Sequence, residues 1–232
     1  MKKHNKIVAI QGDPIPSINK KTDTTLLLAL EAQRRGYKIY YYETKNLAFL
    51  NNKVYALCQE IEFNENKKKF YSIKNTIMTD LSKTSFILMR QNPPFNMDYI
   101  TATFLLEKIS KNTQIINNPF AVRNMPEKLY SIEFLKMMPP TIFTKNVEII
   151  ENFKKKYKKI VVKPTHGYGG KNIFFVNKET KKKQIVFAGI DLISNYLTGD
   201  INITSPTGLK NYKDLTGIDL AFDFWNYLEK KK

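Results

Sequence analysis

The first 120 residues alternate between short apolar runs and amphipathic stretches. Residues 22–35 and 99–108 place apolar side chains at helical spacing, and Gly36 ends the first of these two helices. Residues 44–76 predict only short strands around polar turns. Because strands that alternate with helices form parallel sheets with helices on their faces, we expect residues 1–122 to be an N-terminal parallel α/β domain. Four short apolar runs predict its buried strands: 7–10, 39–42, 86–89 and 114–116.

The pattern changes near residues 118–123, where an Asn-Pro pair interrupts it. Helical spacing follows at 127–137 and 147–157, and a closing amphipathic helix is expected at 217–228. We expect residues 123–232 to form a second region of the α+β type. Its expected strands are 160–163, 173–176, 185–192 and 201–203.

The composition is that of a soluble globular protein, with 42% hydrophobic and 25% charged residues. No apolar run approaches the roughly 18 residues that a membrane helix needs. The single cysteine, Cys58, excludes an internal disulfide, and two histidines argue against a zinc site. We therefore expect a cytoplasmic protein with no membrane partner.

The formal net charge of +17 raises nucleic acid as a partner. However, the chain has only four arginines, and arginine is the preferred reader of phosphate and guanine. The lysines lie in runs such as 67–69 and 181–183, which is typical of compositional drift. We therefore expect no nucleic-acid partner, while a small substrate rich in phosphate would suit the positive field.

A glycine-rich turn at 163–170 lies between two expected strands, whereas a Walker or Rossmann loop leads into a helix. Its glycines, Gly167, Gly169 and Gly170, would let backbone N–H groups approach phosphate oxygens. Lys163, where the first strand ends, would add a positive charge. A plain hairpin with glycines is the alternative interpretation.

Near the C-terminus, Asp200 and Asn202 share one face of an expected strand, and Asp191 ends the strand before it. Two carboxylates and an amide oxygen are ligands that suit Mg²⁺. The alternative is a solvated strand face. The turn at 204–208 offers hydroxyl and N–H groups that suit a carboxylate, although such loops are also common as simple turns.

Two further residues have weaker signals. Arg90 follows a buried strand, at the edge where open α/β sheets bind ligands. Lys128 lies near the start of an expected helix, where a lone lysine is normally on the surface.

Together, six segments in this order resemble the prokaryotic type of glutathione synthetase, an ATP-grasp ligase. They are Gly-Asp-Pro-Ile (12–15), Leu-Glu-Ala-Gln-Arg-Arg-Gly-Tyr (30–37), Leu-Met-Arg-Gln-Asn-Pro-Pro-Phe (88–95), Asn-Met-Pro-Glu-Lys-Leu (124–129), Val-Lys-Pro-x-x-Gly-x-Gly-Gly (162–170) and Asp-Ile-Asn-Ile-Thr-Ser-Pro-Thr-Gly (200–208). The resemblance implies ligation of γ-glutamylcysteine to glycine through an acyl phosphate, with release of ADP and phosphate. It also implies a homo-oligomer and divides 123–232 into a lid part, 123–183, and a metal and substrate part, 184–232.

The resemblance assigns residues to three groups of ligand. Lys128, Lys163, Gly167, Gly169 and Gly170 match positions that bind ATP. Positions that bind Mg²⁺, or Mn²⁺ in its place, match Asp191, Asp200 and Asn202. Five residues match the substrate side: Asp13, Arg90, Ser205, Thr207 and Gly208.

The chain departs from the family between about residues 177 and 184. At this point the sequences of the family contain a strand that forms hydrogen bonds with adenine. They also contain strands with arginines that stabilise the acyl phosphate. All four arginines of this chain lie at or before residue 123, so the resemblance assigns no catalytic residue. Either the gene is internally deleted or the sequence is incomplete. The alternative function is an impaired relic that binds nucleotide or phosphate without ligase turnover.

Overall fold

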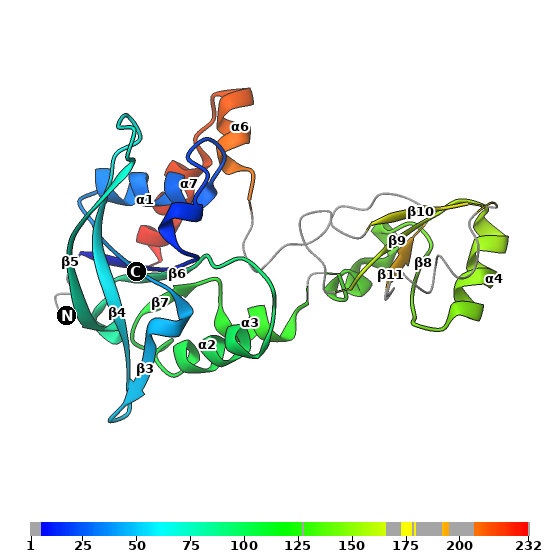
Figure 1. The fold of residues 1–232 in the computed structure, drawn as a ribbon, viewed down its shortest axis with the longest axis horizontal. Coiled ribbons are helices and arrows are strands. Elements are labelled where there is room, and N and C mark those ends of the chain that lie inside the picture. The colour runs from blue at the N-terminus through cyan, green and yellow to red at the C-terminus, as the bar shows by residue number, and fades with distance from the viewer. Residues whose placement is uncertain are drawn as a thin grey trace. The chain divides into compact units, whose positions relative to one another are not determined.

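A computed structural model describes residues 6–126, 128–165, 173–177, 179, 192–194 and 207–231. The chain forms two compact units, which are described separately below (Figure 1). The first unit comprises residues 1–92, 96–123 and 204–232, and the second comprises 93–95 and 124–203.

The first unit is built on a mixed sheet in the order β3-β4-β2-β1-β6-β7, and β5 pairs with β4. β1 pairs in parallel with β2 and β6, and β6 pairs in parallel with β7, which confirms the four predicted strands and the α/β class. The strands are β1 (Ile7–Gln11), β2 (Lys38–Tyr42), β3 (Leu47–Leu50), β4 (Lys53–Phe63), β5 (Tyr71–Asp80), β6 (Phe86–Met89) and β7 (Gln114–Ile116).

Helices cover both faces of this sheet. Figure 1 shows α1 (Thr24–Arg34) on the same face as the C-terminal helix α7 (Leu220–Lys230). The other face carries α2 (Met97–Glu107) and α3 (Pro119–Asn124). The unit also contains three 3-10 turns: η1 (Ile15–Ser17), η2 (Thr44–Asn46) and η3 (Leu81–Lys83).

The structure corrects the prediction for residues 44–76. This region contains one short strand, β3, but β4 and β5 form a long antiparallel hairpin that continues to Asp80. Seven consecutive residues of β5 are exposed, so its sequence lacks the alternation of buried and exposed positions that marks a half-buried strand. This absence explains why the hydrophobic pattern missed β5.

The C-terminal segment contains two helices where one was expected. α6 (Leu209–Thr216) ends at Gly217, whose φ of 76° is a left-handed conformation that favours glycine, and α7 follows. α7 packs against α1 in the first unit, although the sequence pattern grouped it with 123–232. The division into domains at residue 122 stays a prediction.

The second unit contains an antiparallel sheet in the order β10-β9-β11-β8. The strands are β8 (Thr141–Phe143), β9 (Ile160–Lys163), β10 (Phe174–Val176) and β11 (Leu192–Ser194). α4 (Val147–Tyr157) packs on one face through Ile150, which contacts the buried side chains of Ile160 and Val162. β8 was not predicted, because three apolar or hydroxyl residues give too short a pattern.

Two further predictions for the second unit have different outcomes. The helix expected at 127–137 is a 3-10 segment, η4 (Tyr130–Met137), with non-helical backbone angles at Phe134. Most of the strand expected at 185–192 and all of the strand expected at 201–203 lie outside the described residues. β11 pairs with β9 on one side and β8 on the other, so it has neighbours on both edges.

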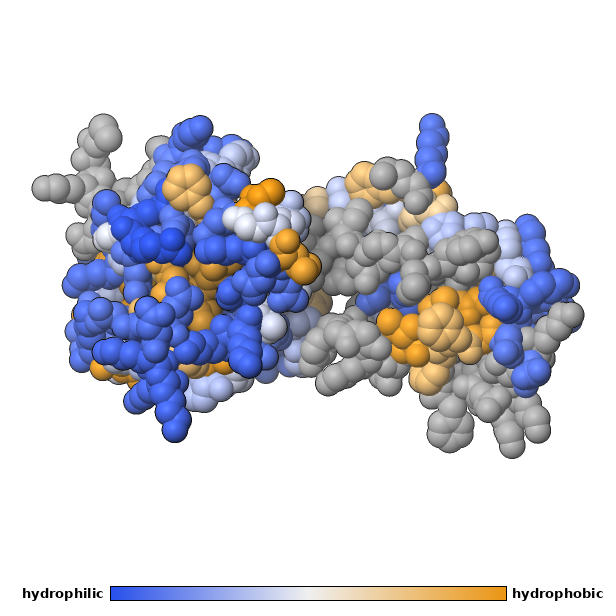
Figure 2. Space-filling model, turned by 90° about the horizontal axis from the view of Figure 1, so that it is seen from above, coloured by the Kyte–Doolittle hydropathy of each residue, from blue (hydrophilic) through white to orange (hydrophobic). Residues whose placement is uncertain are grey.

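Polar and charged side chains cover most of the face of the first unit that Figure 2 shows. Among the described residues, no helix is long and apolar enough to cross a membrane.

Cys58 on β4 is fully buried, and burial raises the pKa of its thiol to about 12. At pH 8 the thiol is therefore protonated and shielded, and only the thiolate reacts with disulfide reagents. We expect no reaction of native Cys58 with Ellman's reagent at pH 8 and one thiol per chain after denaturation in guanidinium. Rapid reaction of the native protein would contradict this placement.

Candidate functional site

The first unit contains a polar pocket of about 400 Å³ at the carboxyl ends of β1, β2 and β6. Ligands of open α/β sheets bind at this edge. The pocket brings together four of the five residues predicted on the substrate side: Asp13, Arg90, Thr207 and Gly208. The fifth, Ser205, lies outside the described residues. Other lining residues include Asn19, Asp23, Thr24, Thr25, Tyr41, Asn92 and Asn211.

Asp13 is held by hydrogen bonds from two neighbouring segments. The amide Nδ2 of Asn92 donates to Asp13 Oδ2 at 2.6 Å, and the Asn92 backbone N–H donates to the same oxygen at 3.2 Å. The Tyr41 hydroxyl donates to the Asp13 carbonyl at 2.6 Å. Gly12 makes this possible, since a Cβ there would meet Tyr41 Cζ at 2.7 Å.

Asp23 also lines the pocket and is the N-cap of α1. Its Oδ1 accepts from the backbone N–H groups of Thr25 and Leu26 at 2.6 and 3.2 Å. This arrangement follows from the sequence, because aspartate before an apolar helical pattern is a preferred N-cap. Its second oxygen, Oδ2, is not used in the cap.

Arg90 follows β6, and its backbone N–H donates to the Gln11 carbonyl at 2.7 Å. Its side chain is largely buried, and Nε donates to Thr25 Oγ1 at 3.2 Å. Burial lowers the pKa of Arg90, while the carboxylate of Asp23 acts in the opposite direction. The guanidinium therefore remains a cation on the wall of the pocket.

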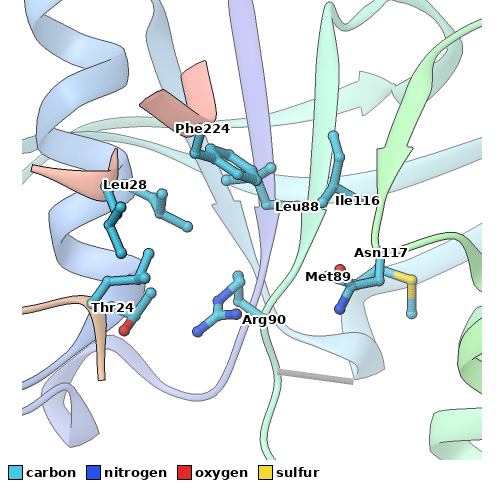
Figure 3. Close-up of a pocket in the computed structure, with 10 residues that line it drawn as sticks. Thr24, Leu28, Leu88, Met89, Arg90, Ile116, Asn117 and Phe224 are labelled. Carbon is cyan, nitrogen blue, oxygen red and sulfur yellow. The ribbon is translucent and has the colours of Figure 1, made fainter. Parts of the chain in front are cut away.

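A second, mainly apolar pocket of about 290 Å³ adjoins Arg90 and Thr24, which line both pockets. Figure 3 shows Leu28 and Phe224 on one side of this pocket and Ile116 and Asn117 on the other. Leu220 and Phe224 come from α7, so the C-terminal helix completes the pocket in the first unit.

In the second unit, the structure buries both lysines predicted to bind ATP. Lys163 ends β9 and is 4% exposed, and Lys128 precedes η4 and is 7% exposed. The Lys163 side chain forms no hydrogen bond or ion pair with the residues that the structure describes. A buried ammonium group is costly without an anion, so Lys163 is well suited to hold one.

Several predicted site residues lie outside the described residues. They are the loop glycines and the proposed metal ligands: Gly167, Gly169, Gly170, Asp191, Asp200 and Asn202. In the described part of the chain, no group of three or more His, Cys, Asp or Glu side chains is placed to hold a metal ion.

The sequence pattern missed Asp23, Thr24 and Tyr41 as pocket residues. Asp23 carries a signal as an N-cap, but that role alone does not indicate a ligand. Tyr41 was expected only as part of a strand, and its place in the pocket depends on the approach of Gly12. Asn92 Nδ2 donates to Asp13, which an ionised carboxylate at this position does not do.

Solved structures with a similar fold include an ATP-grasp ligase. The ATP-grasp ligase PsnB in complex with a minimal precursor has a TM-score of 0.52 and is 15% identical, covering 84% of this chain and 65% of PsnB. D-alanyl-alanine synthetase A from Vibrio cholerae has a TM-score of 0.51 and is 12% identical, covering 85% of this chain and 61% of that protein. The fold is therefore that of an ATP-grasp protein.

Sequence comparisons narrow the class. Residues 7–123 match the prokaryotic glutathione synthetase N-terminal domain, and residues 127–185 and 178–217 match the ATP-grasp domain of the same enzyme. The chain belongs to the prokaryotic glutathione synthetase family. Glutathione synthetase of Mesorhizobium japonicum is 29% identical over 97% of this chain and 98% of its own length. That of Buchnera aphidicola subsp. Baizongia pistaciae is 39% identical over 80% of this chain and 57% of its own length.

The same comparisons bear on the predicted gap. The alignment with the Mesorhizobium protein spans 309 positions, whereas this chain has 232 residues, so the relative contains positions that this chain lacks. The ATP-grasp domain matches in two stretches that meet at 178–185. The missing segment therefore lies inside the ATP-grasp region, as the sequence predicted.

Proposed function

We propose that this protein is a glutathione synthetase that joins γ-glutamylcysteine to glycine with ATP. The observation that supports the proposal most is the polar pocket. Asp13, Arg90, Thr207 and Gly208 are far apart in the sequence of this chain, and all four line this pocket. A pocket of about 400 Å³ is within the range of small-molecule sites.

The proposed reaction has two steps. The cysteinyl carboxylate attacks the γ-phosphorus of ATP, the bond to ADP breaks, and an acyl phosphate forms. The glycine amine then attacks the acyl carbon, an amide forms, and phosphate leaves with a proton released from the amine. Both steps need positioning and neutralisation of charge more than covalent help from the protein.

Lys128 and Lys163 are proposed to bind ATP phosphates, together with Gly167, Gly169 and Gly170. Burial of the two lysines supports this role, because a phosphate would supply the anion that Lys163 lacks among the described residues.

Asp191, Asp200 and Asn202 are proposed to hold Mg²⁺, with Mn²⁺ as a substitute, because oxygen donors suit these ions. A bound divalent cation would neutralise phosphate charge. Since ATP and thiol peptides are cytoplasmic metabolites, we place the reaction in the cytoplasm. A homo-oligomer is proposed from the family alone.

A second candidate is a catalytically impaired relative that binds nucleotide or phosphate without ligase turnover. The internal gap favours it, because all four arginines lie at or before residue 123. Phosphoryl transfer without groups that stabilise the charge on the transferred phosphoryl is slow.

Two measurements on the purified full chain distinguish the candidates. ADP and glutathione are measured after incubation with γ-glutamylcysteine, glycine, ATP and Mg²⁺, and ATP binding is measured by calorimetry. Equal amounts of ADP and glutathione identify the ligase. Binding of ATP with no glutathione identifies the impaired relative, and the absence of both binding and product contradicts both candidates.

A further inference from the structure

The polar pocket is acidic although the chain carries a formal net charge of +17. Asp13 and Asp23 line it, Arg90 is its one charged donor among the described lining residues, and no lysine is part of that lining. Neither aspartate forms an ion pair with a lysine in the described part of the chain. This charge pattern repels a ligand end that is only anionic and attracts one that carries a cation.

A second observation points to a ligand in the same pocket. Thr24 is 2% exposed, and its hydroxyl has no hydrogen-bond partner among the described residues. Thr24 lines the pocket, and Figure 3 shows its hydroxyl and the Arg90 guanidinium directed toward the same side. A buried hydroxyl without a partner is unfavourable, so a polar ligand group at this point would satisfy it.

The chemistry of the pocket matches the two charges of an amino-acid end group. Both aspartates are already fixed, Asp13 by Asn92 and Asp23 by the N-terminus of α1, so their carboxylates are held in place before a ligand binds. Two carboxylates and a guanidinium that line one pocket complement an ammonium group and a carboxylate on the same ligand.

We propose that Asp13 and Asp23 bind the α-ammonium group of the γ-glutamyl residue, with its α-carboxylate on the side of Arg90 and Thr24. This assignment rests on the proposed function, in which γ-glutamylcysteine is the substrate. The α-ammonium group lies at the end of the dipeptide that is away from the reacting carboxylate. Asp13 and Asp23 would therefore select for peptides that carry this group.

The test compares two ligands and four forms of the full chain by isothermal titration calorimetry. The ligands are γ-glutamylcysteine and glutarylcysteine, which lacks only the α-ammonium group. The forms are wild type, Asp13→Asn, Asp23→Asn and a control, Asp80→Asn. Asparagine keeps the shape of aspartate and is a good N-cap, so Asp23→Asn preserves α1. Asp80 is a matched control because it caps η3 and does not line the pocket.

We expect wild type and Asp80→Asn to bind γ-glutamylcysteine about ten- to hundredfold more tightly than glutarylcysteine. This ratio is the usual contribution of one hydrogen bond to a charged group. Asp13→Asn and Asp23→Asn are expected to lose most of this preference. The ratio of the two affinities is read within each protein, so a small loss of stability does not imitate the result.

Wild type that binds both peptides equally would overturn the inference and leave the proposed function intact. The same holds if both pocket variants keep the wild-type preference. Wild type that binds neither peptide would instead contradict the proposed function itself, and this inference with it.

Discussion

A Lys163→Met variant is expected to bind ATP about ten- to hundredfold more weakly than wild type, which is the value of one charged hydrogen bond. Lys163 is 4% exposed where β9 ends, and its ammonium group has no partner among the described residues. Methionine keeps the buried aliphatic chain and removes only the charge. The measurement is calorimetric titration with ATP and Mg²⁺.

The same variant gives a second, opposite readout without ATP. Removing a buried charge that has no partner among the described residues relieves its desolvation cost, so the melting temperature of the ligand-free protein is expected to rise. Lys159→Met is the matched control, since Lys159 is exposed directly before β9. Equal losses of ATP affinity in both variants would indicate a diffuse attraction to positive charge and contradict a phosphate site at Lys163.

A Trp225→Ala variant is expected to lower the free energy of unfolding of the first unit by about 3–5 kcal/mol, the usual cost of deleting a large buried aromatic side chain. Trp225 on α7 is fully buried, and its Nε1 donates to the Leu28 carbonyl at 2.9 Å. Its ring stacks on Tyr37 at a centroid distance of 5.5 Å and meets Phe86 edge-on at 5.4 Å. Urea denaturation followed by circular dichroism measures the loss.

Tyr227→Ala tests whether this loss comes from packing rather than from the helix itself. Tyr227 lies on the same helix and is 56% exposed, so its removal is expected to change stability by less than about 0.5 kcal/mol. If the two variants lost the same stability, α7 would not be part of the core of the first unit, and the grouping of residues 204–232 with that unit would be wrong.

The strands of the parallel sheet were predictable because they are buried on both faces. Residues 86–89 are all buried, so their sequence is a continuous apolar run. α4 was predictable because it buries Ile150 and exposes several other positions, which gives an amphipathic pattern. α1 is buried along most of its length and was predictable from its apolar helical run and from the glycine that follows it. β5 was not predictable, because an exposed edge strand has neither a continuous apolar run nor an alternation of apolar and polar residues.

The family motifs also predicted residues on the substrate side, and the structure places four of them, Asp13, Arg90, Thr207 and Gly208, around one pocket. The sequence had no signal for the roles of Thr24 and Tyr41 there. Thr24 is the first residue of a helix, and Tyr41 is one of three consecutive tyrosines in a strand. Thr24 and Tyr41 line the pocket only because the β1–α1 loop lies close to β2 and to the end of β6 in the folded chain.

By itself, the sequence of this protein determined the fold class, the family and the position of the internal gap. These follow from local periodicity and from motifs that are read in order along the chain. The tertiary structure alone decided that α7 completes the core of the first unit, 197 residues from its partner Leu28. It also decided that an acidic pocket forms within a basic chain. Both features depend on contacts between segments that are far apart in the sequence. The burial of a side chain and the charges around it depend on these distant neighbours, which a local sequence pattern does not include.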